Sequence, residues 1–95
     1  MLILHVTFHT KPGTRELFVK EVLDAGIAKA SEAENGNYYY DFFFSAENKN
    51  DVMLLEKWEN QDVLDIHSKQ PHYEAIGKIK NKYTVSTDIE KHEIK

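Results

Sequence analysis

The sequence contains no cysteine among its 95 residues, so neither a disulfide framework nor a zinc–thiolate site is expected. No apolar run approaches the ~18 residues that a membrane-spanning helix requires. No strong excess of one charge is present, because 12 basic and 16 acidic residues mix along the chain, which is not typical of a nucleic-acid-binding surface. The first residues lack the pattern of a signal peptide. We therefore expect one cytoplasmic domain, residues 1–95, with no nucleic-acid or membrane partner.

Strand and helix patterns alternate clearly along the chain. Residues 2–9 place apolar side chains on one face and His5 and His9 on the other, which predicts a strand. Apolar residues at helical spacing follow from Thr14 to about Ser31. The remaining patterns predict strands at 38–44 and 52–58, a short helix at 61–68 capped by Asn60, a helix from Pro71 to about Tyr83 and a last strand at 84–94.

This order, βαββαβ with the second helix split in two, predicts an α+β fold of the ferredoxin-like type. The middle strands, 38–44 and 52–58, carry apolar residues on both faces, whereas an antiparallel sheet usually has one wet face. Two helices can cover only one face of such a sheet. We therefore expect a homodimer in which a second copy of the chain covers the other face.

The candidate catalytic residues lie between positions 56 and 72. Glu56 and Trp58 are two apart on a strand and therefore share one face. His67 and His72 fall at the ends of two helices, where side chains can point into a cleft. An imidazole titrates near neutral pH, so either histidine can act as a general base. The alternative for each is structural, as a buried helix histidine or a packing residue.

Glu56 lies between Leu54 and Trp58, where a charge needs a partner. It either orients a histidine or accepts a proton, or it forms a cross-strand ion pair within the chain or across the dimer. Trp58 offers a stacking face for a planar ligand, although a single tryptophan at a strand end also suits the core. The aromatic run at 38–44 is divided between a substrate cleft and packing. The residues expected to contact substrate are Trp58, Tyr40, Tyr73 and His5.

No metal site is expected from the sequence. His5 and His9 share a face but lie about 13 Å apart at ~3.3 Å per residue. His67 and His72 are separated by a helix break rather than by the spacing of a helical metal pair. The four glycines are scattered and form no phosphate-binding loop. We therefore expect neither a metal nor another cofactor.

Several of these segments together resemble a known family. Pro12-Gly13, Glu34-Asn35-Gly36-Asn37, Glu56-x-Trp58, His67 and Pro71-His72-Tyr73 are similar to antibiotic biosynthesis monooxygenase (ABM) domains. The resemblance implies a single ABM domain that forms a dimeric α+β barrel. It also implies the activity of a cofactor-free quinol monooxygenase or of the isomerase that acts on the phosphorylated autoinducer-2 signal.

The function expected on this basis is a cofactor-independent monooxygenase that oxidises a quinol or another small phenolic compound with O2. The expected catalytic residues are His67, His72 and Glu56. One alternative is an isomerase that moves a proton next to a carbonyl of a small, phosphorylated signalling metabolite. Another is a non-catalytic dimeric small-molecule-binding module. A phosphorylated substrate would need cations near the cleft, for which the sequence offers Lys57, Lys69 and Lys78.

Overall fold

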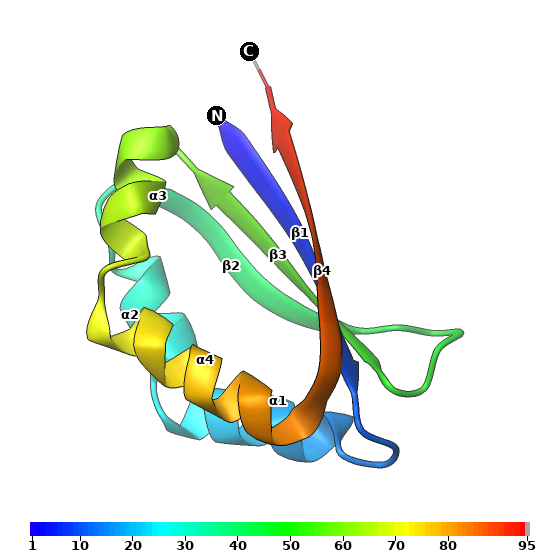
Figure 1. The fold of residues 1–95 in the computed structure, drawn as a ribbon. Coiled ribbons are helices and arrows are strands. Elements are labelled where there is room, and N and C mark those ends of the chain that lie inside the picture. The colour runs from blue at the N-terminus through cyan, green and yellow to red at the C-terminus, as the bar shows by residue number, and fades with distance from the viewer. Residues whose placement is uncertain (95) are drawn as a thin grey trace.

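The computed structural model describes residues 1–94 and contains one four-stranded antiparallel sheet with the helices on one face (Figure 1). The elements, in chain order, are β1 (Leu2–Thr10), α1 (Arg15–Asp24), α2 (Ile27–Glu32), β2 (Asn37–Phe44), β3 (Asp51–Trp58), α3 (Gln61–His67), α4 (Pro71–Tyr83) and β4 (Thr84–Glu93). The strand order is β2-β3-β1-β4. The predicted ferredoxin-like α+β fold and the split of the second helix are confirmed.

The first helix differs from the prediction of one continuous helix over 14–31. It divides into α1 and α2, and the break occurs at Gly26, whose φ of +74° is a left-handed conformation that glycine adopts without a Cβ penalty. Phe18 and Val22 before the break and Ile27 after it are all buried. The apolar spacing therefore continues across the break, which is why periodicity did not reveal it.

The sheet has one covered and one uncovered face. On β3, the side chains of Val52, Leu54, Glu56 and Trp58 point toward the helices and are buried, and the intervening residues point away. The core is completed by residues from β1, α1, α2 and β2: Leu2, Val6, Phe8, Phe18, Val22, Ile27, Ala28 and Tyr40. No helix of the described chain covers the opposite face.

The break between α3 and α4 places two histidines close together. The Asn60 side chain caps α3 by accepting a hydrogen bond from the Val63 backbone N–H at 3.1 Å, and Pro71 occupies the first turn of α4. His67 is the last residue of α3, and His72 lies in the first turn of α4. Among residues 1–94, no helix is both long and apolar enough to cross a membrane.

Candidate active site

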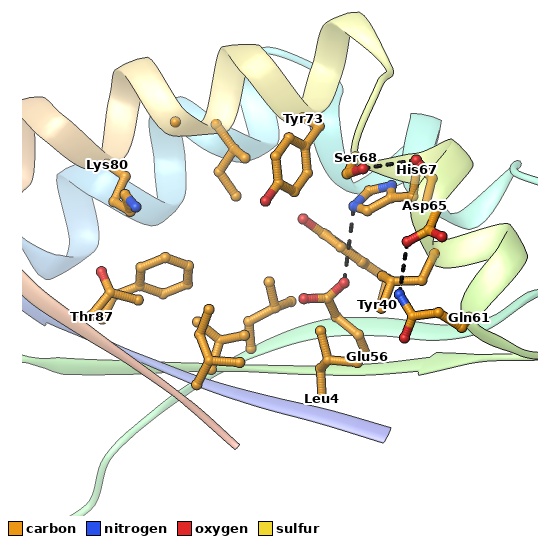
Figure 2. A pocket seen from close by; sticks show the side chains of 17 residues that line it. Leu4, Tyr40, Glu56, Gln61, Asp65, His67, Ser68, Tyr73, Lys80 and Thr87 are labelled. Atoms are coloured by element: carbon orange, nitrogen blue, oxygen red, sulfur yellow. Dashed lines mark hydrogen bonds and ion pairs between the residues drawn. The ribbon is translucent and has the colours of Figure 1, made fainter. Parts of the chain in front are cut away.

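A cavity of about 350 Å³ lies between the covered face of the sheet and helices α3 and α4 (Figure 2). Its floor is apolar and consists mainly of side chains from β1 and β3: Leu4, Val6, Phe8 and Leu54. One end is polar, and there the side chains of Tyr40, Glu56, His67 and Tyr73 face the same space. The cavity therefore combines an apolar body with a compact group of proton donors and acceptors.

His67 connects this cavity to a second carboxylate behind it. Its side chain is almost fully buried, with the residue 3% exposed. The ring Nδ1 lies 2.5 Å from Glu34 Oε2, and Nε2 lies 4.0 Å from Glu56 Oε1 on the cavity side. Since an ionised carboxylate can only accept, Nδ1 carries the proton that is donated to Glu34. The Nε2 lone pair of the neutral ring is then directed toward the cavity.

Burial keeps His67 in this neutral form. It lowers the pKa of His67 below its ordinary value of 6.5, against the opposing effect of the hydrogen bond to Glu34. The ring also packs 4.4 Å from the ring of Trp58 and 5.3 Å from that of Tyr73, centroid to centroid, which fixes its position. His67 is thus an oriented, uncharged base near neutral pH.

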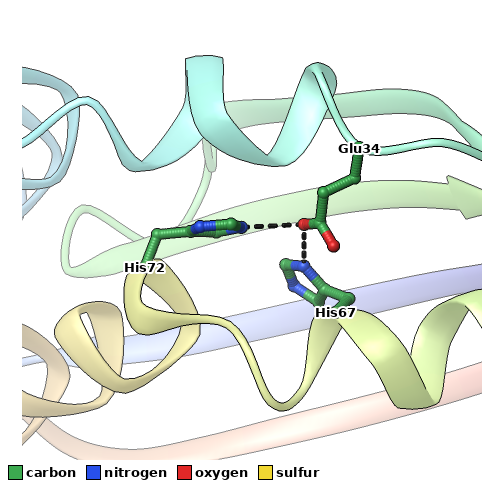
Figure 3. A group of neighbouring side chains, drawn as sticks. All are labelled: Glu34, His67 and His72. Carbon is green, nitrogen blue, oxygen red and sulfur yellow. Dashed lines mark hydrogen bonds and ion pairs between the residues drawn. The ribbon is translucent and has the colours of Figure 1, made fainter.

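Glu34 is a candidate functional residue that sequence reasoning missed. It lies in the turn between α2 and β2, and its Oε2 accepts hydrogen bonds from His67 Nδ1 and, at 2.8 Å, from His72 Nε2 (Figure 3). The turn packs closely against α3 at Gly36, where φ is +86°. Any other residue here would place its Cβ 2.8 Å from Val63 Cγ1, which is too close. The glycine thereby allows Glu34 to reach His67 from a position 33 residues earlier.

Glu56 is buried on the cavity wall, with 6% of the residue exposed. Its Oε1 accepts a hydrogen bond of 3.0 Å from Trp58 Nε1. Burial, aided by the nearby charge of Glu34, raises the pKa of Glu56 to about 7. No lysine or arginine among residues 1–94 pairs with it, so the cross-strand ion pair considered from the sequence is not formed within the chain. Glu56 can therefore hold a proton near neutral pH.

Tyr40 and Tyr73 supply hydroxyl groups to the same end of the cavity. Tyr40 is buried, and this burial, together with the Glu56 carboxyl, raises the pKa of its hydroxyl. Tyr40 therefore remains a hydrogen-bond donor throughout the neutral range. Tyr73 is half-exposed, and its ring stands nearly perpendicular to the His67 ring at 83°. Tyr40 and Tyr73, both expected from the sequence to contact substrate, thus line the cavity.

Three of the expected site residues lie elsewhere. Trp58 is fully buried and does not line the cavity, since the His67 ring covers its face, so it offers no stacking surface to a ligand. His5 points to the opposite face of the sheet, in a shallow hollow with Met53 and Leu55. His72 does not line the cavity either, and contacts Glu34 instead. The expectation that Trp58, His5 and His72 contact a substrate directly is therefore corrected, because none of them lines this cavity.

The lysines considered for a phosphorylated substrate are also outside the cavity. Lys57 lies near the Tyr39 ring on the other face of the sheet, and Lys69 and Lys78 are exposed. Lys80 of α4, which sequence reasoning did not select, lines the cavity instead. The sequence contained an indication of this position, because Lys80 lies seven residues after Tyr73 and therefore on the same side of a helix.

Glu34, His67 and His72 can also be considered as metal ligands. One ligand atom from each residue lies within 4.8 Å of the other two, and the second oxygen of Glu34 is buried without a hydrogen-bond partner among residues 1–94. Two imidazoles and a carboxylate are a donor set suited to zinc or iron(II). The separation of His67 and His72 by a helix break was therefore a wrong reason to exclude a shared site.

The fold and the cavity define a small α+β domain with a histidine–carboxylate acid–base site. Residues 1–78 match the family model described as antibiotic biosynthesis monooxygenase, and the chain belongs to this family. It is 28% identical over 95 residues to the Bacillus subtilis (strain 168) protein named putative monooxygenase YcnE, covering 99% of this chain and 98% of the relative. These similarities support a general monooxygenase-like function.

Two solved structures illustrate how closely the fold is matched. A Bacteroides thetaiotaomicron protein described as a possible oxidoreductase is 26% identical, with a TM-score of 0.87 over 98% of this chain and 96% of that one. PA3566 from Pseudomonas aeruginosa is 20% identical, with a TM-score of 0.86 over 98% of this chain and 92% of that one. At this identity the second comparison supports the fold alone.

Proposed function

We propose that this protein is a cofactor-independent monooxygenase that oxidises a quinol or another small phenolic compound with O2. The observation that carries the proposal is the orientation of His67. Its Nδ1 donates to Glu34, and its Nε2 faces an apolar cavity of a size suited to a small aromatic molecule. The family membership of the chain supports the same class of reaction.

The first step is the removal of a proton from the substrate. A phenol has a pKa of ~10 in water, so it needs a base to ionise at neutral pH. His67 Nε2 accepts this proton, and the imidazolium that forms is stabilised by Glu34, 2.5 Å from Nδ1. His72 holds the same Glu34 oxygen from the other side, and so keeps the carboxylate in place. His72 thus acts through Glu34 rather than on the substrate.

Glu56 and Tyr40 stabilise the oxygen anion that remains. A carboxyl group whose pKa is about 7 is substantially protonated near neutral pH and can donate a hydrogen bond to a phenolate oxygen. The Tyr40 hydroxyl, whose pKa is raised, donates from the adjoining wall. Because the floor of the cavity is apolar, a bound ring displaces water and these hydrogen bonds strengthen.

The electrons in this reaction come from the substrate itself. A quinol gives four electrons to O2, so that one oxygen atom enters the ring of the product, a hydroxyquinone, and the other leaves as water. The two hydroxyl protons of the quinol leave in the water, and the hydrogen displaced from the ring carbon becomes the proton of the new hydroxyl group, so the reaction balances without a further reductant. The protein has to supply only deprotonation, a dry cavity and stabilisation of the anion.

Oxygen uptake with a panel of quinols and polyphenols tests the proposal. We expect His67→Ala to reduce the turnover rate by on the order of 10²- to 10⁴-fold, the usual contribution of a general base. The matched control is His9→Ala, which removes a histidine from the uncovered face of the sheet. Uptake that is equally high in both variants would remove His67 from the mechanism.

An isomerase is the second candidate, and the distance between His67 and Glu56 favours it. A neutral imidazole 4.0 Å from a carboxyl group whose pKa is about 7 can take a proton from one carbon of a hydroxycarbonyl compound and return it to the next. This reaction needs no O2. Conversion of a carbonyl metabolite under nitrogen, with no oxygen uptake on any phenol, would favour the isomerase.

We also propose that the protein acts as a homodimer through the uncovered face of the sheet. That face carries half-buried or exposed apolar side chains, namely Ile3, Tyr39, Phe43, Met53 and Leu55. A charge at its centre, Leu55→Lys, is expected to shift the sedimentation coefficient from dimer to monomer. Leu17→Lys on the exposed side of α1 is the control. A wild-type chain that is monomeric at micromolar concentration would refute the proposal.

A further inference from the structure

Lys80 lies at the end of the cavity remote from His67. It follows Tyr73 by seven residues on α4, so the two side chains point to the same side of the helix at levels ~10 Å apart. The Thr87 side chain of β4 lies at the same end as Lys80, whereas Glu56 and His67 lie at the opposite end (Figure 2). The cavity is therefore polar at both ends and apolar between them.

Lys80 has no acidic partner within the described part of the chain. No hydrogen bond or ion pair joins its Nζ to residues 1–94, although its neighbours on α4 have partners: Lys78 with Glu74 at 3.5 Å and Lys82 with Glu21 at 2.7 Å. Lys80 is also half-buried, whereas Lys78 is exposed. An unpaired lysine on the wall of an apolar cavity is best stabilised by an anion that occupies the cavity.

The surroundings of Lys80 favour an anion with a single charge. Lys80 is the only lysine or arginine among the described residues that line the cavity. It lies in the last turns of α4, where the helix dipole carries partial negative charge and disfavours a dianion. A phosphate monoester would need further cations or several backbone N–H groups. A carboxylate can be bound by one ammonium group together with the Thr87 hydroxyl.

We infer that Lys80 and Thr87 bind a carboxylate at the end of the substrate opposite the hydroxyl group that His67 deprotonates. This inference rests on the proposed function and narrows the substrate to an elongated phenolic acid. The polar ends are separated by ~10 Å along α4 and by about 13 Å along β1, where Leu4 pairs with Glu56 and Phe8 with Thr87. An aromatic ring with a short carboxyalkyl chain fits this length.

Binding of matched ligand pairs tests the inference. We would titrate the protein, without O2, with a homologous series of para-hydroxyphenylalkanoic acids and with the corresponding amides, by isothermal calorimetry. We expect the acid with the best chain length to bind about tenfold more tightly than its amide. Lys80→Met is expected to abolish this preference, and Lys78→Met, which removes a lysine outside the cavity, is expected to retain it.

A reversed charge provides a second test that does not depend on the Met variant. Lys80→Glu is expected to reject the acids and to prefer para-hydroxyphenylalkylamines of the same length. Equal binding of acid and amide by the wild type, or a preference that survives Lys80→Met, would overturn the inference while oxygen uptake with phenols still stood. If no phenol binds and none is oxidised, the proposed function fails, and the inference fails with it.

Discussion

Two histidines in this protein each lie beside two carboxylates, yet their pKa values move in opposite directions. The ring nitrogens of His9 on the uncovered face lie 2.7 Å from Asp51 and Asp88, and hydrogen bonds donated to these carboxylates raise its pKa. His67 on the covered side has Glu34 at 2.5 Å and Glu56 at 4.0 Å, yet burial lowers its pKa. The number of acidic neighbours therefore does not decide the charge of a histidine here; access to water does.

The difference gives the two residues different tasks. His9 favours its charged form, so its contribution to stability is present below pH 6.5 and is lost as the pH rises through its raised pKa. His67 favours its neutral form, so stability is lost as the pH falls below 6.5 toward its lowered pKa. A charged histidine can join the strands of a sheet, whereas a neutral one can accept a proton from a substrate.

The largest expected effect on turnover comes from replacing, at each histidine, the carboxylate that contacts Nδ1 by the corresponding amide. Glu34→Gln removes the negative charge that stabilises the His67 imidazolium, and we expect turnover to fall on the order of 10²- to 10⁴-fold. Asp51→Asn makes the equivalent change beside His9 and should leave turnover within about twofold. The rate of oxygen uptake of the two variants measures this difference in turnover. A similar loss in both would mean that Glu34 has only a structural role.

The second prediction concerns the carboxyl group on the other side of His67. The folded-state pKa of Glu56 is about 7, against 4.5 for the ordinary side chain, so ionisation destabilises the fold as the pH rises from about 4.5 to about 7. Glu56→Gln removes this cost and can still accept the hydrogen bond from Trp58. We expect little change in the free energy of unfolding at pH 4 and a gain of up to about 3 kcal/mol at pH 9, at ~1.4 kcal/mol per pH unit.

Urea unfolding of the wild type and of Glu56→Gln at several pH values measures this difference. Glu90→Gln, the same substitution at an exposed glutamate of β4, is the control. A difference between wild type and Glu56→Gln that does not change with pH would show that Glu56 titrates as an exposed carboxyl group does.

The parts of the fold that follow local patterns could be predicted from the sequence. Strand alternation, the Asn60 cap and Pro71 at the start of a helix correctly gave the element order and the split second helix. The break at Gly26 could not be found in this way, because the buried residues Phe18, Val22 and Ile27 keep helical spacing across it. Periodicity reports which residues face the core and not whether the backbone between them is continuous.

The site was predictable only in part, because its central contact is not local. Four of the residues selected from the sequence line one cavity, namely His67, Glu56, Tyr40 and Tyr73. Glu34 was treated as part of a turn, since nothing in the sequence links it to a residue 33 positions later.

His5 shows a different source of error. The alternation along β1 already placed it opposite Leu4 and Val6, which line the cavity, so His5 on the other face cannot reach a substrate there. Its assignment to the site conflicted with the strand pattern itself. The alternation alone therefore excludes His5 from the cavity.

The third prediction tests the pKa values of the two histidines directly. In a titration followed by NMR of the imidazole nitrogens, His9 is expected to titrate above 6.5 and His67 below 6.5. At neutral pH, the spectrum of His67 should be that of the Nδ1–H tautomer, because Glu34 can only accept. His9→Gln and His67→Gln assign the signals. A His67 signal that titrates above that of His9 would contradict the proposed role of burial.

The smallest effect is expected from metal ions, although His67 and His72 converge on Glu34. Both imidazole nitrogens lie 2.5 and 2.8 Å from the same oxygen, whereas zinc needs separate ligand atoms at ~2.0–2.2 Å around it. A bound ion would have to replace both hydrogen bonds, and its coordination by His67 Nδ1 would leave the ring proton on Nε2, the atom proposed to act as the base. We therefore expect a chelator to leave oxygen uptake unchanged and zinc to raise the melting temperature only slightly. Loss of uptake on chelation, or tight zinc binding that His72→Ala abolishes, would instead identify the three residues as a metal centre.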